Sequence, residues 1–271
     1  MKPSTTATSR KATVPAVARA ARLLDVLSAA KEPQPLFALA KTLALPKSTV
    51  HGLCVTLVEA GLLTRFDNGS YHLGVRIMDL AHAYLARTDL TAEFTKLVTS
   101  EGPLPEESIV LSVLDRADIV YVACRNGSRP FGFNFRIGMR LPANCAASGK
   151  ALLSTFPQEH IRELARAQAF VALTPKSVTA AGPLLKQLAA VQKQGYAVDN
   201  EETRHGMVCI GAPVYSGASA QAVAALGISL PKAGLDARRK ARIVDTITQL
   251  GASLSARLGA SARECPSGKR A

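Results

Sequence analysis

Two cysteines, a histidine and two adjacent glutamates are the residues of this 271-residue chain whose chemistry fits catalysis or metal binding. Cys145, Cys209 and His205 could ligate a metal, but their spacing matches no zinc motif. Glu201 and Glu202 form a carboxylate pair, yet no Ser/His/Asp or Cys/His order places a base against a nucleophile. No Gly-rich phosphate loop occurs either. We therefore expect neither an enzyme nor a metalloprotein, and no cofactor.

The cysteines are odd in number and scattered, without a CxxC pair, which argues against a disulfide framework or a zinc ribbon. We expect reduced and mostly buried thiols, since free cysteine behaves as a small hydrophobe. The five are Cys54, Cys124, Cys145, Cys209 and Cys265.

Anion binding is a second kind of chemistry, and the stretch LPKSTVHGLCVTLVEAG (45–61) suits it. Val50, Cys54 and Leu57 fall on one side of the expected helix, which ends at a glycine. Lys47, Ser48 and Thr49 stand at its positive N-terminus, where phosphate oxygens bind well.

The elements around this helix indicate how it is positioned. An apolar helical pattern starts at Val14 and is broken by KEPQP (31–35), and a short second helix, LFALAKTLAL, follows. After the third helix, LLTRFDNGSYHLG (62–74) reads as a hairpin around Asn68-Gly69. This order is typical of a winged helix-turn-helix, whose last helix enters the DNA major groove.

Charge supports a nucleic-acid partner. The net charge is +13 and the pI about 9.9, and residues 1–87 hold eleven Lys and Arg against five Asp and Glu. Residues 1–13 read as a flexible basic arm without an apolar signal region. No apolar run reaches the roughly 20 residues that span a bilayer. We therefore expect a cytoplasmic protein without a membrane partner.

Beyond the hairpin, residues 75–90 continue as an amphipathic helix suited to be a linker or a dimer seam. The part that follows mixes strand-like and helical patterns, and 108–126 reads as a hairpin. It predicts an α+β domain around an antiparallel sheet, over residues 91–259. A disordered tail is expected over 260–271.

Two features of this second part could hold a ligand. Backbone N–H groups near Ser148 and Gly149, at the start of an expected helix, could bind a carboxylate. The alternating FGFNFRIG (131–138) reads as a strand, and its Phe131, Phe133 and Phe135 offer an apolar wall. Equally, Ser148 and Gly149 could be a helix cap and a packing glycine, and the phenylalanines could belong to the core.

Taken together, the chain resembles the IclR family of bacterial transcriptional regulators over about residues 14–259. Four stretches carry the resemblance in the family's order and spacing: VARAARLLDVL with LPKSTVHGLCVTL, GSYHLGVRIMDLAHAYL, RLPANCAASGKALLS, and GYAVDNEETRHGMVCIGAPV. The resemblance implies a winged helix-turn-helix (14–74), a linker helix (75–90) and a GAF-like effector-binding domain. It also implies dimers, or pairs of dimers, that respond to small organic or aromatic acids.

The resemblance also implies particular site residues. DNA contacts are expected from Lys47, Ser48, Thr49, His51, Gly52, Thr56 and Arg65. Effector contacts are expected from Asn144, Ala147, Ser148, Gly149, Asp199, Met207, Cys209, Gly227 and Ser229.

One position departs from the family's pattern. Similar proteins usually carry arginine where this chain has Gly52, and arginine there could contact a base or phosphate in a bidentate manner. Glycine cannot make this contact, and it lowers helix stability by about 1 kcal/mol relative to alanine.

We therefore expect a ligand-responsive regulator that binds double-stranded operator DNA sequence-specifically and senses a small organic acid. The alternative is a small-molecule-binding or enzymatic GAF-like protein with a weakened DNA-binding domain.

Overall fold

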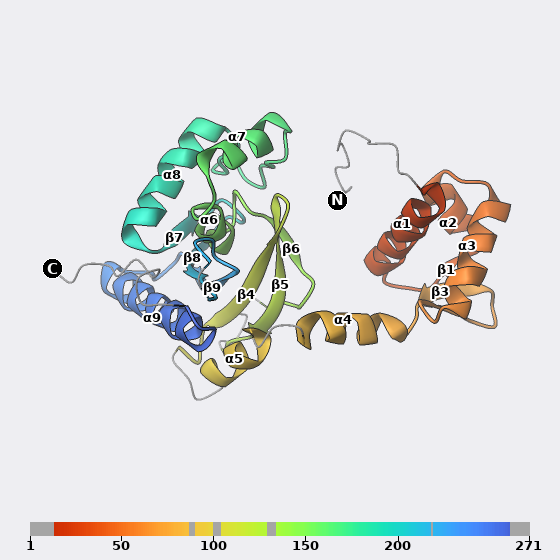
Figure 1. The fold of residues 1–271 in the computed structure, drawn as a ribbon, viewed down its shortest axis with the longest axis horizontal. Coiled ribbons are helices and arrows are strands. Elements are labelled where there is room, and N and C mark those ends of the chain that lie inside the picture. The colour runs from red at the N-terminus through yellow and green to blue at the C-terminus, as the bar shows by residue number, and fades with distance from the viewer. Residues whose placement is uncertain (1–13, 87–89, 100–103, 129–133, 218, 261–271) are drawn as a thin grey trace. The chain divides into compact units, whose positions relative to one another are not determined.

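The computed structural model describes residues 14–86, 90–99, 104–128, 134–217 and 219–260 (Figure 1). They form two compact units, divided between Arg87 and Thr88. The expected basic arm (1–13) and, apart from Ala260, the expected tail lie outside the described residues. In the described part, no helix is both long and apolar enough to cross a membrane.

The first unit is a winged helix-turn-helix, as expected from the sequence. Its strands form an antiparallel sheet in the order β1-β3-β2. The elements are α1 (Pro15–Ala29), β1 (Gln34–Pro35), α2 (Leu36–Leu43), α3 (Lys47–Glu59), β2 (Leu63–Arg65), β3 (Ser70–Leu73) and α4 (Arg76–Ala86).

The core of this unit explains the orientation of α3. Val50, Cys54 and Leu57 are buried against Leu23 of α1 and Leu39 of α2. Their spacing of four and three residues puts them on one helix face, so the opposite face of α3 is left to solvent. Burial raises the pKa of the Cys54 thiol to about 11, which marks this cysteine as a core residue.

The β2–β3 hairpin forms the wing, and its turn is held by local hydrogen bonds. The backbone N–H of Gly69 donates to the carbonyl of Phe66 at 2.9 Å, and Gly69 has a φ of +78°, which favours glycine. The side-chain oxygen of Asn68 accepts from the backbone N–H of Ser70 at 3.0 Å. The Asn-Gly pair therefore sets the turn.

The second unit contains a six-stranded antiparallel sheet in the order β6-β5-β4-β9-β8-β7. Its strands are β4 (Ser108–Asp115), β5 (Asp118–Arg125), β6 (Arg140–Pro142), β7 (Ala197–Asn200), β8 (Met207–Val214) and β9 (Ala224–Pro231). Its helices are α5 (Leu90–Leu97), α6 (Ala147–Leu153), α7 (Gln158–Arg166), α8 (Ala181–Gln194) and α9 (Ala237–Arg257).

Helices α6 and α9 cover opposite faces of this sheet. A Cβ atom placed on Gly211 of β8 would lie 2.6 Å from the backbone nitrogen of Ser148 in α6. The next residue, Ala212, lies against Gly251 of α9. Because successive strand residues point to opposite faces, α6 packs on one side of β8 and α9 on the other.

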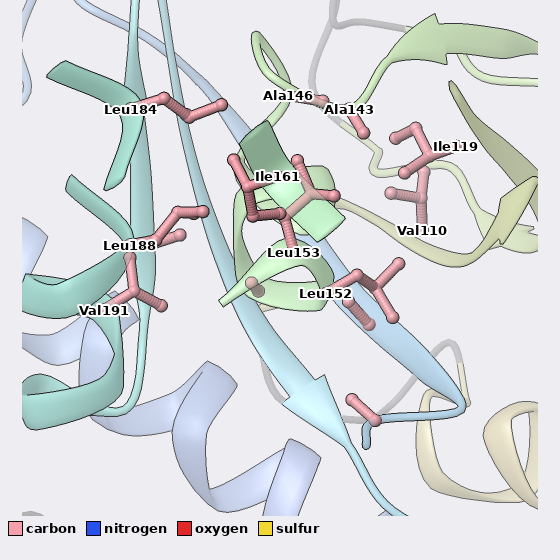
Figure 2. Close-up of a cluster of buried hydrophobic side chains, with 14 of the residues drawn as sticks. Val110, Ile119, Ala143, Ala146, Leu152, Leu153, Ile161, Leu184, Leu188 and Val191 are labelled. Atoms are coloured by element: carbon pink, nitrogen blue, oxygen red, sulfur yellow. The ribbon is translucent and has the colours of Figure 1, made fainter. Parts of the chain in front are cut away.

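The α6 side of the sheet holds the main core (Figure 2). In that view Leu152, Leu153 and Ile161 lie between Leu184 and Leu188 of α8 and the sheet residues Val110 and Ile119. All of these side chains are buried. The apolar stripe of α8 thus fixes α6 against the sheet.

One expected strand is wrong. Among residues 131–138, those from 134 onward form a loop, and the short strand β6 begins only at Arg140. Gly138, with a φ of +83°, turns the chain, and Phe135 packs edge-to-face on Tyr121 with ring centroids 5.5 Å apart. Phe135 therefore anchors this loop to the core. Phe131 and Phe133 lie outside the described residues.

Candidate DNA interface and effector cavity

The solvent-exposed face of α3 carries the side chains expected to meet DNA. Lys47, Ser48 and His51 are exposed, and Thr49 is half-buried. Pro46 stands at the N-cap without a side-chain cap, and no acidic residue lies in the first turn. The N-terminal N–H groups of α3 therefore remain available to an anion.

Gly52 and Thr56 lie one turn apart on the same face, and both are exposed. The Thr56 hydroxyl donates to the carbonyl of Gly52 at 3.1 Å, so its methyl group is the part directed to other contacts. A Cβ atom on Gly52 would meet no other atom within 4 Å. The surface of α3 is therefore flat and open at this point.

Arg65 ends strand β2 at the wing and is exposed. Phe66, which follows it, is also exposed. Within this unit, α3 is anchored near its C-terminal end by Arg76 of α4, whose guanidinium donates to the Ala60 carbonyl at 2.7 Å.

The second unit contains a cavity between the sheet and the N-terminal end of α6. Its empty volume is about 290 Å³, including the space at its mouth. The wall is made by Val110, Tyr121, Leu141, Ala146, Ala147, Ser148, Asp199, Thr203, Met207, Cys209, Gly227 and Ser229. An apolar wall that carries a few polar side chains is typical of a small-molecule site.

Three polar side chains enter the cavity from α6, β8 and β9. The Cys209 thiol and the Ser229 hydroxyl are hydrogen-bonded to each other at 3.2 Å, because their residues are directly paired across the two strands. Ser148 is buried, and its hydroxyl has no hydrogen-bond partner among the described residues. A ligand can therefore find donors and acceptors on both the helix and the sheet.

Asp199 enters the cavity from β7 and is fully buried. Its carboxylate accepts hydrogen bonds from the Glu202 backbone N–H at 2.6 Å and from the Thr203 hydroxyl. Burial raises the pKa of the Asp199 carboxyl, and these hydrogen bonds act in the opposite direction. Asp199 thus holds the loop after β7 while facing the cavity.

A buried ion pair lies next to this loop. The ammonium group of Lys150, in α6, donates to the Glu202 carboxylate and to the Val198 carbonyl, each at 2.5 Å. Lys150 is only 1% exposed and Glu202 5%. The pair therefore joins α6 to the segment that carries Asp199.

Two residues expected at the effector site lie outside the cavity wall. The Asn144 amide donates to the carbonyls of Val171 and Val178 at 3.0 and 2.9 Å, which ties the α7–α8 connection to the turn before α6. A Cβ atom on Gly149 would lie 2.3 Å from the Ala143 carbonyl oxygen, so this glycine permits close backbone packing. The structure gives both a packing role.

Sequence reasoning did not identify five residues of the wall, namely Val110, Tyr121, Leu141, Ala146 and Thr203. Thr203 lies inside one of the stretches shared with the family, four residues after Asp199, and that proximity was the available signal. Tyr121 and Val110 lie in apolar strands, whose sequence pattern predicts burial but no cavity. Val110 is paired with Gly227 of β9, and Tyr121 with Ser112 of β4, so the strand register determines which of their neighbours face the cavity.

The candidate metal ligands of the sequence were Cys145, Cys209 and His205. In the described part of the chain, no group of three or more His, Cys, Asp or Glu side chains could hold a metal ion. His205 is exposed, whereas Cys145 and Cys209 are buried, and burial raises the pKa of both thiols. The three residues do not form a shared site.

Comparisons with known proteins agree with this geometry. Residues 16–66 match the IclR helix-turn-helix domain, and residues 82–256 match the bacterial transcriptional regulator IclR C-terminal domain. The HTH-type transcriptional regulator XynR of Escherichia coli is 28% identical over 247 residues, which cover 91% of this chain and 98% of XynR.

Solved structures show the same fold. The Agobacterium tumefaciens repressor BlcR is 33% identical, with a TM-score of 0.60 over 92% of this chain and 99% of BlcR. An IclR homologue of Microbacterium hydrocarbonoxydans, complexed with 4-hydroxybenzoate, is 22% identical, with a TM-score of 0.75 over 90% of this chain and 98% of that one.

A winged helix-turn-helix joined to a second unit with a small-molecule cavity defines a DNA-binding transcriptional regulator rather than an enzyme. The chain belongs to the IclR family of bacterial transcriptional regulators.

Proposed function

We propose that α3 reads operator DNA through Lys47, Ser48, Thr49, His51 and Thr56, with Arg65 of the wing on the adjacent backbone. Two observations support this proposal. All of these residues are exposed except Thr49, which is half-buried, and the N-terminus of α3 is uncapped. Because Lys47 and Arg65 neutralise phosphates, affinity should fall steeply with salt. Gly52 leaves a gap in this face, so readout depends on its neighbours.

The ligand of the second unit is a small organic or aromatic acid. The observation that carries this proposal is the cavity itself, with hydroxyl groups and a thiol among apolar side chains. The similar fold of the homologue complexed with 4-hydroxybenzoate supports the choice of a small acid. Of the expected residues, Ala147, Ser148, Asp199, Met207, Cys209, Gly227 and Ser229 form the proposed site.

The functional form is a homodimer, or a pair of dimers, joined through the linker helix of residues 75–90. Exposed apolar side chains at Val75, Met78 and Leu80 support this proposal. Two-fold symmetry of the protein implies a roughly palindromic operator. Ligand binding in the effector-binding domain (91–259) would then change the placement of the two reading heads.

The test is selection of binding sites from random duplex DNA at fixed salt, followed by fluorescence anisotropy with the enriched sequence and a panel of organic acids. We expect enrichment of a pseudo-palindrome and an acid that changes operator affinity. Binding without enrichment would contradict sequence-specific readout. Enrichment with no response to any acid would contradict the proposed ligand while leaving the DNA-binding function in place.

A further inference from the structure

The charges around the effector cavity raise a specific problem for an acidic ligand. The wall, as the described residues define it, includes no lysine, arginine or histidine. It does include Asp199, which is fully buried. An entering carboxylate would therefore meet a buried carboxyl group and no positively charged side chain in the wall.

The other ionisable groups facing Asp199 do not compensate. From α6, Lys150 is held by Glu202 at 2.5 Å, so this pair is neutral as a unit. From β5 and β8, Tyr121 and Cys209 have pKa values raised by burial and are uncharged near neutral pH. Among the wall residues, Asp199 is thus the one whose negative charge would repel an anionic ligand.

The hydrogen bonds of Asp199 leave room for a proton. One carboxylate oxygen accepts from the backbone N–H groups of Glu202 and Thr203, at 2.6 and 3.3 Å. The other oxygen accepts from the Thr203 hydroxyl. That second oxygen can carry a proton and donate it in a hydrogen bond, since a protonated carboxyl is both a donor and an acceptor.

We propose that the acidic effector enters this cavity together with one proton, which the effector carboxylate and Asp199 share; this inference rests on the acid sensing proposed above. Two carboxylates that share a buried space do not both ionise, because like charges at short distance in a low dielectric repel strongly. With one proton taken from solvent, one carboxyl donates to the other. The ligand class is therefore a monocarboxylic acid that binds as a hydrogen-bonded acid–carboxylate pair.

The direction of the pH effect follows from the proton count. Where Asp199 is ionised in the free protein and protonated in the complex, binding takes up a proton, so the affinity falls as the pH rises. The dissociation constant should increase by up to about tenfold per pH unit in that range. Below the pKa of Asp199 in the free protein the affinity should level off, as long as the acid itself stays ionised.

The test is isothermal titration calorimetry on the full chain between about pH 5.5 and about pH 8, where an exposed aspartate or a free benzoic acid stays ionised. The probes are 4-hydroxybenzoate, benzoate, lactate and glycolate, with 4-hydroxybenzamide as a neutral analogue. Repeating the titrations in buffers of different ionisation enthalpy counts the protons taken up. We expect uptake approaching one proton for the acids and pH-independent binding of the amide.

Asp199→Asn and Asp245→Asn provide the matched pair of variants. The amide side chain of Asp199→Asn keeps an oxygen for the two backbone N–H groups and offers a fixed N–H donor, so the acid should bind without proton uptake. Asp245 is exposed on α9, and its variant should behave like the wild-type protein. Should Asp199→Asn fail to fold, the comparison of acid with amide on the wild-type protein still decides the question.

Three other results of these titrations would contradict separate parts of the proposal. Acid binding with an affinity independent of pH and no proton uptake would overturn this inference and leave the acid-sensing function intact. Proton uptake that persists in Asp199→Asn would overturn the role of Asp199. If none of the acids binds at any pH, the proposed acid sensing itself is overturned, and this inference falls with it.

Discussion

At the scale of single residues, position 52 is an open point on the proposed DNA-reading face of α3. Gly52 is exposed, and an added Cβ atom meets nothing within 4 Å. We predict that Gly52→Arg tightens operator binding, by about 1–3 kcal/mol where the guanidinium contacts a base and less where it contacts a phosphate. Fluorescence anisotropy at several salt concentrations measures this change.

Gly52→Ala is the control for this prediction. It should raise the free energy of unfolding by up to about 1 kcal/mol, because alanine favours the helix, and it should leave DNA affinity unchanged. Urea denaturation separates this stability effect from the contact made by arginine. Weaker DNA binding by Gly52→Arg would show that position 52 approaches the DNA too closely for a side chain.

Gly227 in β9 sets the depth of the effector cavity. A Cβ atom there would lie 3.0 Å from a methyl group of Val110 and 3.6 Å from the Ser148 Cβ atom, both in the cavity wall. We predict that Gly227→Ala weakens effector binding at least tenfold, since even one added methyl group overpacks a tight site. Operator binding without ligand should be unchanged, as measured by anisotropy.

Gly182→Ala tests whether this effect is specific to the cavity. Gly182 lies in α8 with nothing within 4 Å of an added Cβ atom, so its variant should bind the effector normally. Unaltered effector affinity in Gly227→Ala would mean that Val110 moves aside, or that the ligand occupies another part of the cavity.

The site residues show how far a sequence can predict a cavity. Stretches shared with the family pointed to Ser148, Asp199 and Cys209, and these do line one cavity. That they bind an effector stays a prediction. Gly149, next to Ser148, faces Ala143 instead, because the side of a helix that meets a sheet is set by packing between distant segments. Neighbours in sequence therefore take different roles that the sequence alone does not separate.

At the scale of elements, the Lys150–Glu202 pair links α6 to the loop after β7. Because both side chains are almost fully buried, removing one leaves a buried charge without its partner. We predict that Lys150→Met lowers the free energy of unfolding by about 3–5 kcal/mol. Urea denaturation followed by circular dichroism gives this value.

Lys186→Met is the matched control, since Lys186 is exposed on α8 and its loss should change stability by less than about 0.5 kcal/mol. The double variant Lys150→Met with Glu202→Leu should recover much of the lost stability, because it removes both buried charges. A double variant as unstable as Lys150→Met alone would show that packing, rather than charge, explains the loss.

Elements were predicted well where the pattern is local. The helix over 45–61 and the Asn-Gly hairpin follow from residue spacing and turn chemistry, and the structure has them as α3 and the wing. The loop from residue 134 to 139 was wrongly predicted as a strand. The contact of Phe135 with Tyr121 and the turn at Gly138 are set by the tertiary structure, and a residue pattern does not contain them.

At the scale of the whole molecule, exposed apolar side chains at and just before the start of α4 support the proposed association of two copies. Val75, Met78 and Leu80 are 81%, 68% and 54% exposed, far more than apolar side chains of a helix that is covered within its own chain. A protein that binds two half-sites needs such an interface, since linking two weak contacts raises affinity by about 10²–10⁴. The net charge of +13 then adds attraction to DNA without specifying the site.

We predict that Met78→Glu combined with Leu80→Glu converts the proposed dimer to a monomer and weakens binding to a two-half-site operator by at least about 100-fold. Each head keeps its fold, because both side chains are exposed, so affinity for a single half-site should change little. Sedimentation velocity over a range of concentrations, together with anisotropy on both DNAs, measures the two effects.

Ile137→Glu is the control, because it places the same charge at an exposed apolar position of the second unit. This variant should remain dimeric. A double variant of α4 that stays dimeric would move the interface to another surface, and the palindromic operator would then have to be explained from there.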